Sequence, residues 1–178
     1  MGGTHAFRSK SSPPAAVAGF PLQSLPQYKH AHISKQTKHK TNKTPMQKIE
    51  HIGIAVKSLQ NSIPIYETML HTTCYKTETV ESEQVKTAFF QIGENKIELL
   101  ESLAPDGVIA KFIEKKGEGI HHIAYAVDDI EAEMRRLKAN GFVLLSEQPK
   151  RGADNKMVCF LHPKNTSGVL TELCMNIE

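Results

Sequence analysis

The sequence predicts an α+β fold built from two tandem β-α-β-β-β modules. The first observation is an internal repeat: residues 49–56 (Ile-Glu-His-Ile-Gly-Ile-Ala-Val) match residues 120–127 (Ile-His-His-Ile-Ala-Tyr-Ala-Val) at an offset of 71. The second is that a helical pattern and three short apolar segments follow each copy. The two copies are 71 residues apart, and there are only two of them. This period is too long for a solenoid, so the repeat indicates duplication of one module.

The first module begins with a strand at residues 49–56, whose apolar run is typical of a buried strand. Ser58 or Ser62 can cap the helix that follows. Its apolar residues have helical spacing: Ile63, Tyr66 and Leu70. Pro64 lies either in the first turn of this helix or at a kink. Three strand candidates complete the module: residues 73–80, 86–92 and 96–101.

The second module repeats this order from residue 120. Asp128 or Asp129 can cap its helix, and Gly141 ends it. The buried face of this helix is predicted to hold Ile130, Met134 and Leu137. The strand candidates are residues 142–146, 156–161 and 169–175. A linker helix at about residues 105–116 joins the modules, so we expect one domain over residues 46–178, made of modules 46–101 and 119–178.

Residues 1–45 have a different composition, with seven Lys/Arg and no acidic residue. They lack hydrophobic periodicity, which predicts a disordered basic tail. The tail is either a mitochondrial transit peptide or an upstream extension before a natural start at Met46. We favour the extension and expect a cytoplasmic protein, whereas a transit peptide would direct the protein to the mitochondrial matrix.

Charge and cysteine usage exclude several classes of protein. The other 133 residues have a net charge of −4, so the basic pI comes from the tail and the domain itself is mildly acidic. We therefore expect no nucleic-acid partner. No apolar run is long enough to cross a membrane. The three cysteines lack a C-x-x-C spacing, and Cys159 and Cys174 lie in apolar runs. They are predicted to be free thiols in a reducing compartment.

The duplication also repeats two polar residues within apolar strands. His51 matches His122 at the offset of 71, and Glu98 matches Glu172 at a similar offset of 74. An ionised carboxylate among apolar strand residues is unfavourable unless it is paired or bound to a cation. Two imidazoles and two carboxylates suit an octahedral divalent transition ion, with two positions left for water or substrate. These four residues are therefore the predicted metal ligands.

Strand alternation supports this assignment, because residues two apart share a face. Small residues share the faces of His51 and His122 and leave room beside each imidazole: Gly53, Ala55, Ala124 and Ala126. The same alternation places His121 on the opposite face, which excludes it from the predicted ligand set.

Three segments resemble methylmalonyl-CoA epimerases of the vicinal oxygen chelate superfamily. They are residues 117–124 (Gly-Glu-Gly-Ile-His-His-Ile-Ala), 160–164 (Phe-Leu-His-Pro-Lys) and 168–173 (Gly-Val-Leu-Thr-Glu-Leu). With the duplicated module and its His/Glu set, the resemblance covers residues 47–176. It implies a glyoxalase-like fold, in which the modules form a curved, partly open β-sheet barrel with helices outside. It also implies a homodimer that interconverts (R)- and (S)-methylmalonyl-CoA in propionate metabolism, with cobalt as the first candidate metal and manganese, nickel or zinc as alternatives.

The resemblance implies that the metal chelates the substrate's carboxylate and thioester oxygens and stabilises the enolate formed when the α-proton leaves. Epimerisation also needs a base on one face of the α-carbon and an acid on the other, and Glu172 and Glu98 are the expected pair. Some relatives have a glutamate where this chain has Thr87, which leaves the second base open and makes Glu172 the firmer assignment. Three basic loop residues are candidates for binding the phosphates of coenzyme A: Lys150, Arg151 and Lys164. His162 is interpreted as a turn residue.

Three other functions are compatible with parts of the pattern. A glyoxalase-like lyase or isomerase of the same fold can have an identical metal set. A ring-cleaving dioxygenase fits less well, because its two-histidine, one-carboxylate site has no place for a fourth ligand such as Glu98. A metal-free binding protein of the superfamily would be expected to have lost the His/Glu set, which is complete here.

Overall fold

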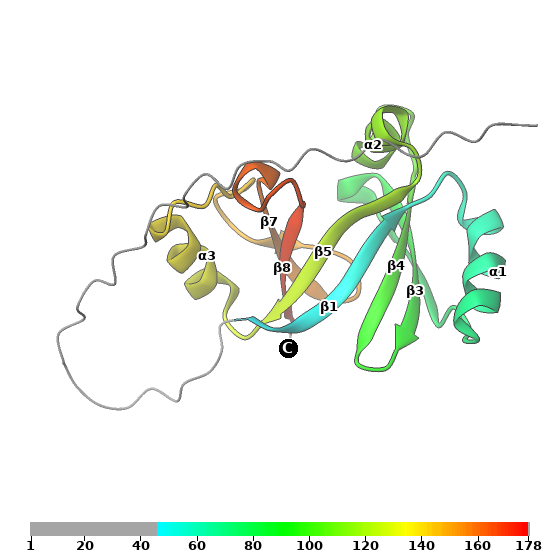
Figure 1. Cartoon of the computed structure of the whole chain (residues 1–178), viewed down its shortest axis with the longest axis horizontal. Helices are drawn as coiled ribbons and strands as arrows, with labels where there is room; N and C mark the ends of the chain where they lie inside the picture. Colours follow the sequence, from blue (N-terminus) through cyan, green and yellow to red (C-terminus); the bar gives the residue numbers. More distant parts are fainter. Residues whose placement is uncertain (1–45, 178) are drawn as a thin grey trace, which may run out of the picture. The chain divides into compact units, whose positions relative to one another are not determined.

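One continuous eight-stranded sheet runs through residues 46–177, the part of the chain that this computed structural model describes (Figure 1). The strand order is β2-β3-β4-β1-β5-β8-β7-β6. The first half of the domain contains β1 (Met46–Ala55), α1 (Leu59–Leu70), β2 (Lys76–Val80), a 3-10 helix (Glu81–Glu83), β3 (Val85–Ile92) and β4 (Asn95–Ser102). After α2 (Val108–Lys116), the second half contains β5 (Gly119–Val127), α3 (Ile130–Ala139), β6 (Lys150–Arg151), β7 (Lys156–Leu161), a 3-10 helix (Pro163–Asn165) and β8 (Thr171–Asn176).

The two halves are related by an approximate two-fold arrangement about the centre of the sheet. There, β1 and β5 pair antiparallel, and each is parallel to the last strand of its own half, β1 to β4 and β5 to β8. Figure 1 shows the sheet curling, with α1 and α3 at its two sides. The predicted duplicated module and the curved, partly open sheet are therefore confirmed.

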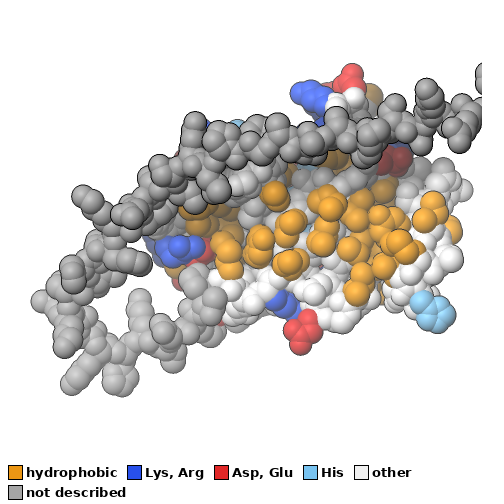
Figure 2. Space-filling model, in the orientation of Figure 1, with side chains coloured by type: hydrophobic (Ala, Val, Ile, Leu, Met, Phe, Trp, Pro, Cys, Tyr) orange, Lys and Arg blue, Asp and Glu red, His pale blue; other side chains and the backbone are white. Residues whose placement is uncertain are grey.

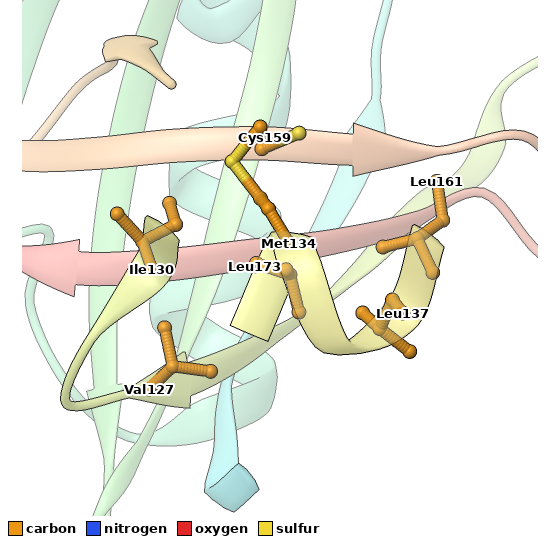
Figure 3. Close-up of a cluster of buried hydrophobic side chains, with 7 residues drawn as sticks. All are labelled: Val127, Ile130, Met134, Leu137, Cys159, Leu161 and Leu173. Atoms are coloured by element: carbon orange, nitrogen blue, oxygen red, sulfur yellow. The ribbon is translucent and has the colours of Figure 1, made fainter. Parts of the chain in front are cut away.

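Each of the two longer helices packs its apolar face on the sheet strands of its own half. In the second half, α3 covers β7 and β8 through the cluster drawn in Figure 3: Val127, Ile130, Met134, Leu137, Cys159, Leu161 and Leu173. In the first half, Val56 and Leu59 pack with Phe90 and Leu99, and Tyr66 of α1 contacts the ring of Phe90. Burial of these side chains, at about 1.5–3 kcal/mol each, stabilises the curled sheet on its outer side.

The caps of these helices resolve the alternatives left by the sequence. Ser58 Oγ accepts a hydrogen bond from the backbone N–H of Asn61, so α1 starts at the earlier of the two candidate serines. Asp129 Oδ1 accepts from the backbone N–H of Ala132 at 2.9 Å and caps α3. Pro64 is the sixth residue of α1, beyond its first turn, where it removes one intrahelical donor.

The strand predicted at residues 142–146 does not form. Leu144 makes a single bridge to Leu161, and the edge strand is instead the two-residue β6. The backbone N–H of Val143 is taken by the side-chain oxygen of Asn165 at 3.1 Å, which interrupts a regular ladder along β7. The alternating hydrophobic pattern of this segment therefore forms a loop in which Val143 and Leu145 are exposed.

A band of hydrophobic side chains lies over the sheet on the face of the molecule seen in Figure 2. Residues of β1 and β5 that alternate with the site histidines are only half-buried: Ile52, Ile54, Ile123 and Tyr125. Within residues 46–177, no helix has the length and apolar character needed to cross a membrane. The predictions for the basic tail lie outside the described residues.

Candidate metal and active site

Four polar side chains from four strands converge inside the curl of the sheet: His51 of β1, Glu98 of β4, His122 of β5 and Glu172 of β8. The Nε2 atoms of the two histidines are 3.0 Å apart. Glu98 Oε2 lies 3.3 Å from Nε2 of His51 and 3.6 Å from Nε2 of His122. Glu172 lies 3.3 Å from Nε2 of His122 and 4.0 Å from Nε2 of His51. The structure thus brings together all four residues that the sequence repeat singled out.

The strand register explains why these side chains meet. Gly53 of β1 is the direct neighbour of both Glu98 on β4 and His122 on β5. In the matching row, Ala124 of β5 lies between His51 and Glu172. Each row therefore has a histidine and a glutamate with a small residue between them, and a Cβ added at Gly53 would lie 2.2 Å from Cε1 of His122. The small residues leave room for the rings, as predicted, but each one lies beside the histidine of the neighbouring strand rather than the histidine of its own strand.

Two irregularities in the β1–β5 ladder shape the surroundings of the histidines. The pairing advances by two residues on β1 between Ile49 and His51, and by two residues on β5 between Ile120 and His122. Glu50 and His121 are thus the extra residues of two β-bulges, and a bulge breaks the alternation of side chains. The prediction that His121 faces away from the site is therefore wrong. Its ring lines the same cavity as the ring of His122.

Each bulged residue contacts the Nδ1 atom of the histidine that follows it. His51 Nδ1 donates to Glu50 Oε2 at 2.5 Å, and the Nδ1 atoms of His121 and His122 are 3.0 Å apart. Since both Nδ1 atoms are engaged, Nε2 is the nitrogen that each histidine turns toward the cluster. Partners of this kind fix ring orientation and tautomer in histidines that ligate metals.

A partly buried ionic network extends from Glu50 and was not predicted from the sequence. Glu50 Oε1 accepts from Lys96 Nζ at 2.6 Å and lies 3.0 Å from Lys156 Nζ. Lys96 also contacts Asp154 Oδ2 at 2.6 Å, and Asp154 lies 3.2 Å from Lys76 Nζ. In the repeat, Glu50 occupies the position equivalent to His121.

Burial and neighbouring charges perturb the protonation of the cluster in the metal-free protein. Burial raises the pKa of Glu172 to about 8, with Glu98 adding to the shift and His51 opposing it. Burial also raises the pKa of Glu98, again against the attraction of His51. For His51, burial alone would lower the pKa, but the hydrogen bond to Glu50 and the nearby carboxylates raise it to about 9. Burial, with His51 and His121 close by, holds the pKa of His122 well below its usual value.

The donor set fits one divalent ion. The candidate ligand atoms of His51, Glu98 and His122 all lie within 4.8 Å of one another, and Glu172 approaches both imidazoles. Adjacent ligands at about 2.1 Å from an octahedral ion lie about 3.0 Å apart, and opposite ligands about 4.2 Å apart. The observed separations of 3.0–3.6 Å, and 4.0 Å for His51 and Glu172, lie within about 0.6 Å of these values, so small side-chain movements would complete such a ligand set.

A cavity of about 250 Å³ opens onto the four residues. Its apolar walls include Val80, Val85, Phe89, Leu100, Ile109, Leu145, Val158, Phe160 and Leu170. Thr87 lies on the wall, fully buried, and its hydroxyl donates to the backbone oxygen of Glu78 at 3.4 Å. Apolar walls around a few convergent polar groups are typical of a small-molecule site.

The predicted phosphate-binding residues have different surroundings. Lys150 lines the cavity and forms an ion pair with Glu83 at 2.5 Å. Arg151 and Lys164 are exposed and are not among the residues that line this cavity. His162 caps the 3-10 helix at Pro163–Asn165 by accepting from the backbone N–H of Lys164, as its interpretation as a turn residue requires.

The fold and the site define a class of protein: a duplicated β-α-β-β-β domain with a His/Glu cluster inside its curled sheet. Residues 50–160 match the Glyoxalase/Bleomycin resistance protein/Dioxygenase superfamily. The chain is 39% identical over 127 residues to the mitochondrial methylmalonyl-CoA epimerase of Homo sapiens, covering 71% of this chain and 72% of the relative. It is 41% identical over 128 residues to the ethylmalonyl-CoA/methylmalonyl-CoA epimerase of Cereibacter sphaeroides, covering 71% and 96%.

A solved structure has the same fold. A variant of Streptomyces coelicolor methylmalonyl-CoA epimerase in complex with 2-nitronate-propionyl-CoA superposes with a TM-score of 0.72 at 33% identity, covering 75% of this chain and 99% of that one. The chain therefore belongs to the Glyoxalase/Bleomycin resistance protein/Dioxygenase superfamily and, within it, is homologous to methylmalonyl-CoA epimerases, which are isomerases. The resemblance found in the sequence is confirmed.

Proposed function

We propose that the protein is a divalent-metal-dependent epimerase that interconverts the (R) and (S) forms of methylmalonyl-CoA. The observation that supports this best is the convergence of His51, Glu98, His122 and Glu172 at one cavity, in a chain homologous to enzymes named for that reaction. A relative in complex with a nitronate analogue of an acyl-CoA adds support, because a nitronate has the planar, oxygen-centred negative charge of an enolate.

In this proposal, His51 and His122 hold the metal through Nε2, and Glu98 and Glu172 hold it through carboxylate oxygens. The metal supplies a Lewis acid that stabilises negative charge on the thioester oxygen when the α-proton leaves. Two imidazoles with two carboxylates suit cobalt, manganese, nickel or zinc, and cobalt is the first to test. The apolar walls of the cavity exclude water and so strengthen each of these electrostatic interactions.

Glu172 is the proposed base. Its carboxylate takes the α-proton, the electron pair of the C–H bond moves into the thioester carbonyl, and a proton returned to the opposite face completes epimerisation. A bound cation would lower the basicity of this carboxylate, so Glu172 would have to loosen its metal bond during turnover to accept the proton. Glu98, the pseudo-symmetric partner, is the proposed acid on the other face; to donate, it would begin the step protonated and end it ionised, and exchange with solvent would return both carboxyl groups to their starting states. Thr87 has no acid–base function near pH 7.

The test is epimerisation of methylmalonyl-CoA, followed by α-proton exchange in deuterated water. Glu172→Gln keeps the shape and an oxygen donor but removes the basicity, so the rate should fall at least ~10²-fold with the fold intact. Exchange should fall mainly for one epimer, and Glu98→Gln should show the opposite preference. Glu131→Gln, on the exposed face of α3, is the matched control. A Glu172→Gln protein that binds metal and epimerises at the wild-type rate would refute this mechanism.

We also propose that the protein is a homodimer. The hydrophobic band over the sheet supports association, because exposed apolar patches of this kind mark contact surfaces. Light scattering coupled to gel filtration tests this directly, and a monomer at micromolar concentration would contradict it.

A further inference from the structure

We propose that Glu50 is a positioning residue that fixes the tautomer and orientation of His51, and that Lys96 and Lys156 hold Glu50 in place for this purpose. This inference rests on the proposed metal site. It concerns a residue outside the His/Glu cluster, brought to it by the bulge in β1.

The geometry at His51 assigns a proton to its Nδ1 atom. The carboxylate of Glu50 is 5% exposed and lies 2.5 Å from His51 Nδ1. Its other oxygen contacts two ammonium groups, of Lys96 at 2.6 Å and Lys156 at 3.0 Å. A carboxylate held by two cations acts as an acceptor only, so His51 Nδ1 is the donor. When metal binding displaces the proton on Nε2, the Nε2 lone pair points at the cluster, as a metal ligand requires.

Glu50 is in turn anchored from the second half of the chain. Asp154, in the loop between β6 and β7, contacts Lys96 at 2.6 Å through Oδ2, and its backbone N–H donates to Glu78 of β2 at 3.0 Å. Lys156 is nearly buried and also donates to the side-chain oxygen of Asn176. The carboxylate beside His51 is therefore held by lysines from both halves of the sheet.

The counterpart of Glu50 in the repeat is His121, whose imidazole contacts His122 Nδ1. A carboxylate is a stronger acceptor than an imidazole, because it has a full negative charge. The Nδ1 atoms of the two candidate ligand histidines thus have unequal hydrogen-bond partners, and the partner of His51 is the stronger acceptor. The ionic network around Glu50 also links distant segments of the sheet. That structural role alone would not require one of its carboxylates to contact Nδ1 of a candidate ligand histidine.

The experiment measures cobalt binding by calorimetry to the chelator-treated full chain, with melting temperature recorded in parallel. Glu50→Gln should weaken cobalt binding by about 10–100-fold, the usual effect of removing such a partner. The control Glu94→Gln, at an exposed turn between β3 and β4, should bind like wild type. A second measurement uses the wild-type protein loaded with zinc, in which long-range proton–nitrogen NMR should find His51 protonated at Nδ1 and ligated through Nε2.

Each outcome decides the question. Weaker binding by Glu50→Gln together with the Nδ1-protonated tautomer supports the positioning role. Unchanged cobalt affinity in a folded Glu50→Gln protein overturns it, and so does a His51 that is unprotonated at Nδ1 in the zinc-loaded wild type. The NMR result stands alone if Glu50→Gln does not fold. Absence of any metal binding by the wild type would overturn the metal site of the proposed function as well. Normal metal binding without epimerisation would overturn only the proposed reaction.

Discussion

Replacing Gly53 with alanine tests the geometry of the site by sterics alone. Gly53 has no positive φ, so its backbone accepts alanine. The added Cβ would lie 2.2 Å from Cε1, 2.5 Å from Nδ1 and 2.7 Å from Nε2 of His122. Ordinary contact begins near 3.4 Å, so the ring must move by about 1.2 Å. It is enclosed by the rings of His51, His121 and Phe160, which leaves it little room.

The expected effect on metal binding is large because ligand distances are tolerant only to about 0.2 Å. We expect Gly53→Ala to weaken cobalt binding at least ~10²-fold and to destabilise the metal-free protein by about 1–3 kcal/mol, as overpacking does. Calorimetry measures the first effect and urea unfolding the second. Gly117→Ala is the control: nothing lies within 4 Å of the added Cβ, and its φ of +78° with ψ of −176° favours glycine, so it should cost about 1–3 kcal/mol with cobalt affinity unchanged. A folded Gly53→Ala protein with wild-type cobalt affinity would refute His122 as a ligand in this geometry.

Two further predictions concern pH and the rim of the cavity. Because the pKa of Glu172 rises from 4.5 to about 8 on folding, its contribution to metal-free stability is present at low pH and is lost as pH rises through 8. Metal binding must displace the protons that the candidate ligand side chains hold in the metal-free protein. Cobalt affinity and the rise in Tm on cobalt loading should therefore both increase from about pH 6 to 8. A cobalt affinity that does not change with pH would contradict this. Lys150→Met removes the ion pair with Glu83 at the rim, so stability should change by less than about 1 kcal/mol. If Lys150 binds a phosphate of coenzyme A, KM for the acyl-CoA should rise several-fold with kcat unchanged, and an unchanged KM would exclude that role.

The sequence alone determined the duplicated module and the four residues that meet in the cavity. This was possible because the repeat is a one-dimensional property: His51 and His122, or Glu98 and Glu172, occupy equivalent positions whatever the packing. Apolar strand segments and cap residues are also local signals, so the order of helices and strands followed from them. The segment at 142–146 is an exception, because Asn165, distant in sequence, takes one of its backbone donors.

Only the tertiary structure decided how the site is supported. A β-bulge is a property of the register between two strands, so the turn of His121 toward His122 has no signature in β5 alone. Gly53 matters because it lies between Glu98 and His122 across three strands, a relation set by sheet order rather than by spacing. The anchoring of Glu50 by lysines of both halves requires the sheet to curl until distant segments meet. The sequence does not show which of its many acidic and basic residues pair with one another. The pairing is decided where the fold buries charged groups together, because a buried charge without a partner is unfavourable.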